Sequence, residues 1–151
     1  MNTILVPTDG SQTAGKALGV ALDLAEKHNA KIKLLHVLLR DMEPEELLGL
    51  PGLAKNQEVT RQLSDLAKGP GTPRSTEDLM AKPNAPERPA PEALLHKIAA
   101  HVLDQANAQA KSRGVAIEAL DVADGAAAPA IKAAAEAQAA DTIVMGMRGL
   151  G

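Results

Sequence analysis

Two short segments near the ends of the chain contain the residues best suited to bind a ligand. Residues 8–11, Thr-Asp-Gly-Ser, follow a short apolar run and combine a carboxylate with two hydroxyl groups. Residues 146–151 follow a second apolar run and contain Gly146, Gly149 and Gly151. A glycine-rich loop after a buried strand lets bare backbone N–H groups face an anion, so the second segment is typical of a phosphate-binding loop.

Asp9 is the candidate carboxylate of the first segment, and two roles are open to it. It would accept hydrogen bonds from a sugar hydroxyl or an exocyclic amine of a ligand, or it would bond its own backbone as a turn residue. Because the second segment is expected at the same edge of the fold, we favour the ligand-binding role.

The second segment also allows two interpretations. Gly146 and Gly149 would be plain turn residues if this loop stood alone. Arg148 would pair with a phosphate, or it would remain solvated in the loop. Met145 and Met147 are packing residues, or they form an adaptable apolar wall against a planar ring.

Strands and helices are expected to alternate around these segments. Apolar periodicity predicts strands at residues 3–7, 31–37, 116–122 and 142–145, and helices at residues 12–28, 92–113 and 129–139. Ser11 is the expected N-cap of the first helix and Gly114 the expected stop of the second. We expect Gly15 and Gly19 in the first helix to allow close approach to the sheet.

This alternation predicts an α/β fold, an open parallel sheet with helices on both faces in a Rossmann-like arrangement. The strand at residues 116–122 begins with alternating apolar and acidic residues, which suits a position near a sheet edge. Ligands of such sheets bind at the carboxyl ends of the strands, where the strand order reverses. Both candidate segments follow strands and therefore belong at that edge.

Residues 38–91 form a Pro-rich insert in an otherwise regular chain, which we expect to be a single domain over residues 1–151. The insert carries eight of the ten prolines, and residues 68–91 have few apolar side chains. Such a composition is typical of disorder, so we interpret the insert as a flexible excursion. Val59, Leu63 and Leu66 predict a short helix within it that could bind a protein partner.

The composition excludes several classes of function. The net charge of -3 gives no electrostatic attraction to nucleic acid or to an anionic membrane, and without aromatic residues no platform can stack bases. Without cysteine there are no disulfides and no thiolate chemistry. No signal peptide and no apolar stretch of bilayer length is visible, so we expect a cytoplasmic protein.

Catalytic and metal-binding patterns are not visible either. His96 and His101 are five residues apart, a spacing that does not place both on one helix face, so no metal site is predicted. The sequence shows no Ser-His-Asp arrangement, no complete Walker loop and no paired carboxylates with a defined role, so no catalytic residues are predicted.

Taken in order, the two segments resemble the universal stress protein (UspA-like) family. Ile-Leu-Val-Pro-Thr-Asp-Gly-Ser at residues 4–11 and Asp-Thr-Ile-Val-Met-Gly-Met-Arg-Gly-Leu at residues 141–150 carry the resemblance. It implies a parallel sheet of five strands in the order 3-2-1-4-5. One branch of the family binds ATP through Gly-x-x-Gly followed, after a spacer, by Gly-Ser or Gly-Thr. The 151 residues contain the first half of that motif but neither its second half nor a fifth strand, so we expect residues beyond Gly151.

The resemblance implies a role for each residue of the first wall of the site. Asp9 would meet the nucleoside end of the ligand, and Pro7 and Thr8 would line the same wall. Val37, at the end of the second strand, would contact adenine through its backbone.

The second segment would supply the opposite wall. Met145 and Gly146 would lie near the ribose. Gly149 would bring its N–H to a phosphate, and Arg148 is the candidate side chain for phosphate pairing.

These implications lead to a cytoplasmic stress-response protein that binds ATP, with Mg²⁺ on the phosphates, and acts as a sensor or regulator more than as an enzyme. The family often forms homodimers through its fifth strand. One alternative is a dimeric interaction protein of the same fold that binds no nucleotide. Another is a slow ATP hydrolase, which would need a group that activates water.

Overall fold

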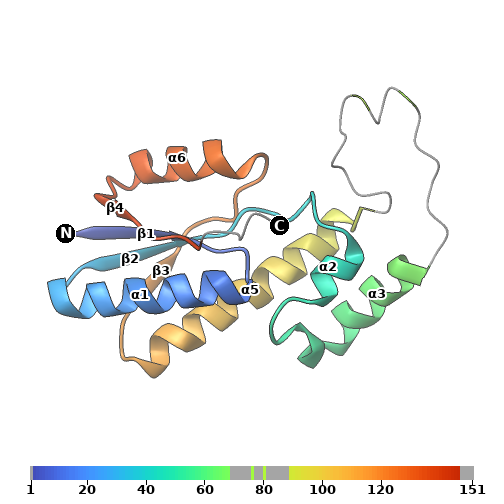
Figure 1. Ribbon diagram of the computed structural model, residues 1–151, viewed down its shortest axis with the longest axis horizontal. Helices are drawn as coiled ribbons and strands as arrows, with labels where there is room; N and C mark the ends of the chain where they lie inside the picture. Colours follow the sequence, from blue (N-terminus) through green and yellow to red (C-terminus); the bar gives the residue numbers. More distant parts are fainter. Residues whose placement is uncertain (1, 69–75, 77–79, 81–88, 147–151) are drawn as a thin grey trace. The chain divides into compact units, whose positions relative to one another are not determined.

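The computed structural model describes residues 2–68, 76, 80 and 89–146 of the chain (Figure 1). The chain divides into two compact units, Met1–Leu38 with Ala99–Gly151, and Leu39–Ile98. We call the first the sheet unit and the second the helical unit. Most of the predicted Pro-rich insert belongs to the helical unit, and the prediction of one domain over residues 1–151 stays a prediction.

A four-stranded parallel sheet forms the centre of the sheet unit. The strands are β1 (Thr3–Pro7), β2 (Lys31–Leu35), β3 (Ile117–Ala119) and β4 (Thr142–Ile143), in the order β3-β2-β1-β4. In register, Thr3 of β1 pairs with Lys31 of β2, and Ile4 of β1 pairs with Thr142 of β4. The predicted parallel α/β sheet is confirmed, and β3 lies at an edge as expected.

Helices cover both faces of this sheet. Figure 1 shows α6 (Ala127–Ala137) on one face, and α1 (Gln12–His28) with α5 (Glu92–Ser112) on the other. The face toward α1 and α5 is closed by small and branched aliphatic side chains, so the helices lie close to the strands without any aromatic residue. Its buried residues are Ile4, Val6, Leu18, Ala21, Leu22, Ala25, Ile32, Leu34, Ala106 and Ala110.

The helix ends follow the predicted capping residues. The Ser11 hydroxyl oxygen accepts a bond of 3.1 Å from the backbone N–H of Ala14, which makes Ser11 the N-cap of α1. Beyond α5, Gly114 has a φ of 70°, and Val115 N–H returns to Ala110 O over 3.1 Å. This is the Schellman geometry that stops a helix at a glycine.

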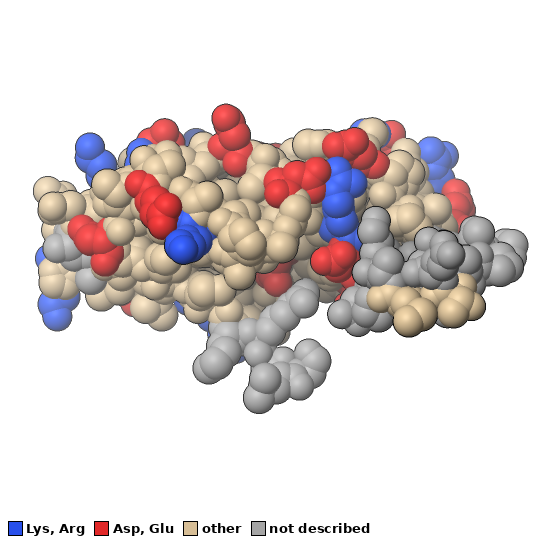
Figure 2. Space-filling view, turned by 90° about the horizontal axis from the view of Figure 1, so that it is seen from above, with Lys and Arg blue, Asp and Glu red and all other residues tan. Residues whose placement is uncertain are grey.

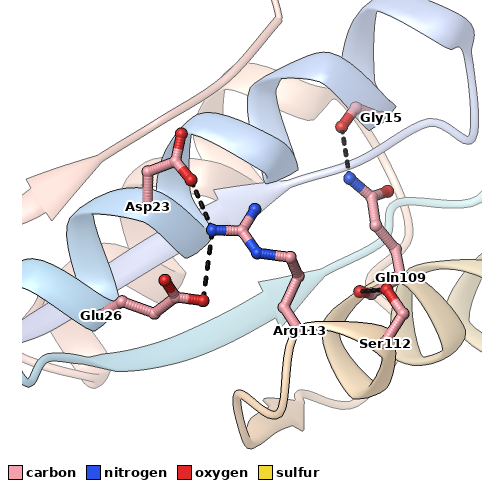
Figure 3. Close-up of polar contacts among 6 residues, drawn as sticks. All are labelled: Gly15, Asp23, Glu26, Gln109, Ser112 and Arg113. Atoms are coloured by element: carbon pink, nitrogen blue, oxygen red, sulfur yellow. Dashed lines mark hydrogen bonds and ion pairs between the residues drawn. The ribbon is translucent and has the colours of Figure 1, made fainter.

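Polar side chains join α1 to α5 on the side shown in Figure 3. The Gln109 amide nitrogen donates to the backbone oxygen of Gly15 over 2.9 Å. One guanidinium nitrogen of Arg113 lies 2.5 Å from Asp23 and 3.2 Å from Glu26, so a single arginine directly after α5 pairs with two acids of α1.

The glycines of α1 face this contact and not the sheet, so that part of the sequence prediction was wrong. The nearest atoms that a Cβ on Gly15 or Gly19 would meet belong to the Gln109 amide, at 3.9 and 3.7 Å. The sheet side of α1 is occupied by alanines and leucines of the buried core, which are Leu18, Ala21, Leu22 and Ala25. Both distances are ordinary van der Waals contacts, so neither glycine is required for space.

β1 has the predicted bounds, and the other three strands are shorter than predicted. β2 ends at Leu35, with Val37 in a separate bridge to Ala123, β3 covers only the middle of residues 116–122, and β4 ends at Ile143. The partner strand β1 ends at Pro7, which has no N–H to continue the ladder.

The helical unit corrects the interpretation of the insert. Residues 44–68 contain α2 (Pro44–Leu48), a 3-10 helix (Leu53–Lys55) and α3 (Gln57–Lys68). Apolar side chains at helical spacing are buried within the unit, so this part is not a flexible excursion; they are Leu47, Leu50, Leu53, Val59 and Leu63. The predicted helix near residues 59–66 is confirmed. Most of residues 68–91, for which disorder was predicted, lie outside the described residues.

Candidate functional site

The candidate site lies where β1 ends, between the ends of β2 and β4. Thr8 N–H donates to Leu35 O over 2.8 Å, which ties the segment after β1 to β2. On the other side, Val144 N–H donates to Leu5 O over 3.0 Å and ties the segment after β4 to β1. The two segments singled out by the sequence therefore meet at one edge of the sheet, as the topology predicts.

The first segment forms a hydrogen-bonded turn. Asp9 Oδ1 accepts from Ser11 N–H over 2.9 Å, and Thr8 Oγ1 accepts from Gly10 N–H over 3.2 Å. Asp9 thus makes the turn-forming bond that was one of its two expected roles. Its contact with a ligand stays a prediction.

Gly10 lets this turn lie directly on α5. Its φ of +82° falls in the left-handed region, and a Cβ built there would come within 2.6 Å of Val102 Cγ2. Both the backbone conformation and the available space therefore require glycine.

Gly146 brings the second segment against the start of α1. A Cβ on Gly146 would lie 3.0 Å from both the carbonyl carbon and the oxygen of Thr13. A close approach was expected at this glycine. In this structure Gly146 makes it to the backbone of Thr13. It places residue 146 beside the helix that the Thr8–Asp9 turn leads into.

Two apolar residues flank the end of β1. Met145 precedes Gly146 and keeps 54 % of its surface exposed. On the other side, Val37 is half-buried and bridges Ala123 in parallel. The bonds of this bridge use His36 O and Leu38 N–H. Because successive peptide groups of an extended chain point to opposite sides, the N–H and C=O of Val37 are directed toward the β1 side.

The remaining predicted residues divide into two groups. Pro7 and Thr8 are half-buried at the end of β1, beside the turn, as expected. Arg148 and Gly149 lie outside the described residues, so the phosphate end of the predicted site stays a prediction.

His36 is a site residue that the sequence placed only within the predicted strand at residues 31–37. Its side chain is fully buried, and Nδ1 lies 2.9 Å from Thr8 O, inside the turn segment. Burial lowers the pKa of His36, while the bond to the Thr8 carbonyl and the negative charge of Asp9 act in the opposite direction. The alternation of Ile32, Leu34 and His36 on one face of the predicted strand at residues 31–37 was the available signal for burial.

A family model described as the universal stress protein family matches residues 1–151. The chain belongs to this family. The resemblance inferred from the two segments is therefore confirmed.

Solved structures of other family members share the fold of this universal stress protein. A family member from Burkholderia pseudomallei is 26 % identical with a TM-score of 0.57, covering 97 % of this chain and 81 % of its own. UspA from Lactobacillus plantarum is 21 % identical with a TM-score of 0.57, covering 99 % of this chain and 79 % of its own. A universal stress protein in complex with cAMP is 19 % identical with a TM-score of 0.53, covering 95 % and 74 %. A search of curated proteins gave no match.

The described surface of this universal stress protein shows mixed charge. Figure 2 shows acidic and basic side chains interspersed on the face that it presents. Among the described residues, no three His, Asp or Glu side chains form a group that could hold a metal ion. In the same part of the chain, no helix combines the length and apolar character needed to span a membrane.

Proposed function

We propose that this universal stress protein binds an adenine nucleotide at the carboxyl edge of the sheet, with the nucleoside between the Thr8–Asp9 turn and residues 144–146. The observation that carries the proposal is the packing of Gly146 against Thr13, at 3.0 Å from an added Cβ, because it holds the two segments at one edge. The family member solved with cAMP supports an adenine nucleotide as the ligand class.

The residues at this edge fit the parts of a nucleoside. The Val37 peptide group offers a donor and an acceptor to the edge of adenine, and exposed Met145 offers a flexible apolar surface to its ring. A carboxylate accepts several hydrogen bonds, so Asp9 can accept from a ribose hydroxyl while it keeps the bond to Ser11.

In this proposal the ligand is ATP, and its phosphates extend toward Arg148 and Gly149. Mg²⁺ is bound through the phosphates, as is usual for this ion. The protein acts in the cytoplasm as a sensor or regulator whose state depends on the bound nucleotide.

Calorimetry with adenosine and with ATP tests the role of Asp9. We expect Asp9→Ala to weaken the binding of adenosine and of ATP by the same factor. The factor should be about 10-fold to 100-fold, the size expected for a hydrogen bond to a charged group. The factors should agree because the lost contact is to the nucleoside. If only ATP binding suffers, Asp9 does not contact the nucleoside.

Two control variants separate the ligand contact from the turn. Asp9→Asn keeps an oxygen that can accept from Ser11 N–H but removes the charge, so it should retain the fold and lose part of the affinity. Asp104→Ala, on the exposed side of α5, should leave binding unchanged. Without Trp or Tyr the chain absorbs little near 260–280 nm, so co-purified adenine nucleotide would dominate its spectrum. An adenine-free spectrum together with no heat of binding would refute the proposal.

A second candidate function is that of a dimeric interaction protein. It is favoured by β4, which pairs only with β1 among the described strands and leaves 44 % of Ile143 exposed. An apolar edge strand can pair with a second copy of the chain. Sedimentation equilibrium of wild type and Ile143→Lys tests this, and equal monomer mass for both would exclude it.

A further inference from the structure

We propose that His36 is a positioning residue for the Thr8–Asp9 turn: its buried neutral ring holds the turn in place, and protonation of the ring releases it. The ring is inaccessible to solvent, and Nδ1 is 2.9 Å from Thr8 O. His36 therefore acts on the segment that carries Asp9 without itself facing the ligand. The consequence for ligand binding rests on the nucleotide site proposed above.

The geometry determines which nitrogen carries the proton. A backbone carbonyl oxygen can only accept a hydrogen bond, so Nδ1 must be the donor to Thr8. In the neutral ring Nε2 is then an acceptor, and it is buried with no hydrogen-bond partner among the described residues. The resting state is thus a neutral imidazole with the proton on Nδ1.

Protonation would place a second N–H on the buried Nε2, where the described structure offers no acceptor. A buried donor without a partner is costly, so the protonated ring must move or gain access to water. Both a shift of the ring and the opening that admits water strain the bond from Nδ1 to Thr8 O. The charged group that acts on the ring is Asp9, in the turn after β1, and its attraction for the imidazolium is outweighed by burial.

The turn depends on that bond through a short chain of contacts. Thr8 Oγ1 accepts from Gly10 N–H and Asp9 Oδ1 accepts from Ser11 N–H, so both bonds start from residues that the His36 ring positions. Release of the Thr8 carbonyl therefore loosens the turn as a unit.

The direction of the pH effect follows from the lowered pKa. The ordinary value for histidine is 6.5, and burial shifts the folded value below it. The closed turn is fully favoured above pH 6.5 and is lost as the pH falls through the lowered pKa. Nucleoside affinity should be constant from pH 8 to 6.5 and decrease at lower pH.

Nitrogen-15 NMR of the full chain without nucleotide tests the positioning role directly. We expect the His36 ring to show the Nδ1–H tautomer and to titrate below pH 6.5, the ordinary value for histidine. In His36→Leu, the Gly10 and Ser11 amides should exchange about 10-fold faster, because the part-buried Thr8 carbonyl has lost its hydrogen-bond donor. The Val144 amide, which is bonded to Leu5 O, serves as the internal reference.

His36→Asn is the matched rescue variant. Its side-chain NH₂ can replace Nδ1 as the donor to Thr8 O, but it cannot be protonated in this range. Exchange of the turn amides in this variant should stay within about threefold of wild type, a smaller change than loss of one hydrogen bond. An Nε2–H tautomer, a His36 titration at or above pH 6.5, or unchanged exchange of the turn amides in His36→Leu would overturn the proposal.

Adenosine binding from pH 8 to 5 then tests the functional consequence. Adenosine is the probe because it has no phosphate that titrates in this range. Wild type should lose about 10-fold in affinity at low pH, while His36→Asn should show no such loss. An equal loss of affinity in wild type and His36→Asn would assign the pH effect to another group. It would overturn the proposal that protonation of His36 releases the turn. If wild type binds no adenosine at pH 8, the proposed nucleotide site fails, whereas the turn exchange still decides the role of His36.

Discussion

Gly10→Ala should destabilise the sheet unit for two reasons that can be measured separately. An alanine at a φ of +82° adopts the left-handed region, which costs about 1–2 kcal/mol. Its Cβ would also lie 2.6 Å from Val102 Cγ2, and such overpacking costs about 1–3 kcal/mol. Together the free energy of unfolding should fall by about 2–5 kcal/mol.

Gly114→Ala is the control for the backbone contribution. Gly114 has a φ of +70°, and an added Cβ would meet nothing within 4 Å. This variant should therefore lose only about 1–2 kcal/mol. The difference between the two alanine variants measures the contact with Val102.

A double-mutant cycle with Val102→Ala isolates that contact. Removing both γ carbons leaves Val102 Cβ at 3.5 Å from the new Cβ at position 10, an ordinary contact. Gly10→Ala with Val102→Ala should therefore be more stable than the sum of the single changes by about 1–3 kcal/mol.

Urea unfolding followed by helical circular dichroism is the assay, because the chain has no Trp or Tyr for fluorescence. The reasoning is refuted if Gly10→Ala costs no more than Gly114→Ala, or if the two changes in the cycle are additive.

Four further changes should follow from particular contacts. Gly15→Ala should raise the free energy of unfolding by about 0.5–1 kcal/mol in the same urea assay, because the new Cβ fits at 3.9 Å and alanine favours the helix. Ala139→Gly should raise it by about 1 kcal/mol, because Ala139 stops α6 at a φ of 50°. Gly146→Ala should lower it by about 1–3 kcal/mol through overlap with the α1 backbone, and no loss would contradict the packing described. Hydrogen bonds, first from Asn2 N–H, lower the pKa of Asp141, so stability should fall as the pH drops through that lowered pKa. The pH dependence of the urea midpoint should be weaker in Asp141→Asn.

The elements of the sheet unit were predictable because their signals are local. The apolar run at residues 3–7 and the stripe of alanines and leucines after Ser11 depend only on side chains a few positions apart. Ser11 begins α1 and Gly114 ends α5 as expected, because each cap bonds groups only a few residues away in the same segment. The prediction of a flexible excursion was wrong for residues 44–68. It rested on composition, and prolines at helix starts and in turns were counted as signs of disorder.

The sequence by itself determined the strand and helix order of the sheet unit, the two candidate segments and the family to which the chain belongs. It could not decide what Gly10, Gly146 and His36 touch, because Val102, Thr13 and Thr8 come from other elements. Only the tertiary structure brought these pairs together. From the sequence, Gly146 was predicted to lie beside a ligand, and His36 was placed only in a predicted strand. The fold shows a glycine packed on α1 and a buried ring bonded to the turn, because parallel pairing places the ends of β1, β2 and β4 at one edge.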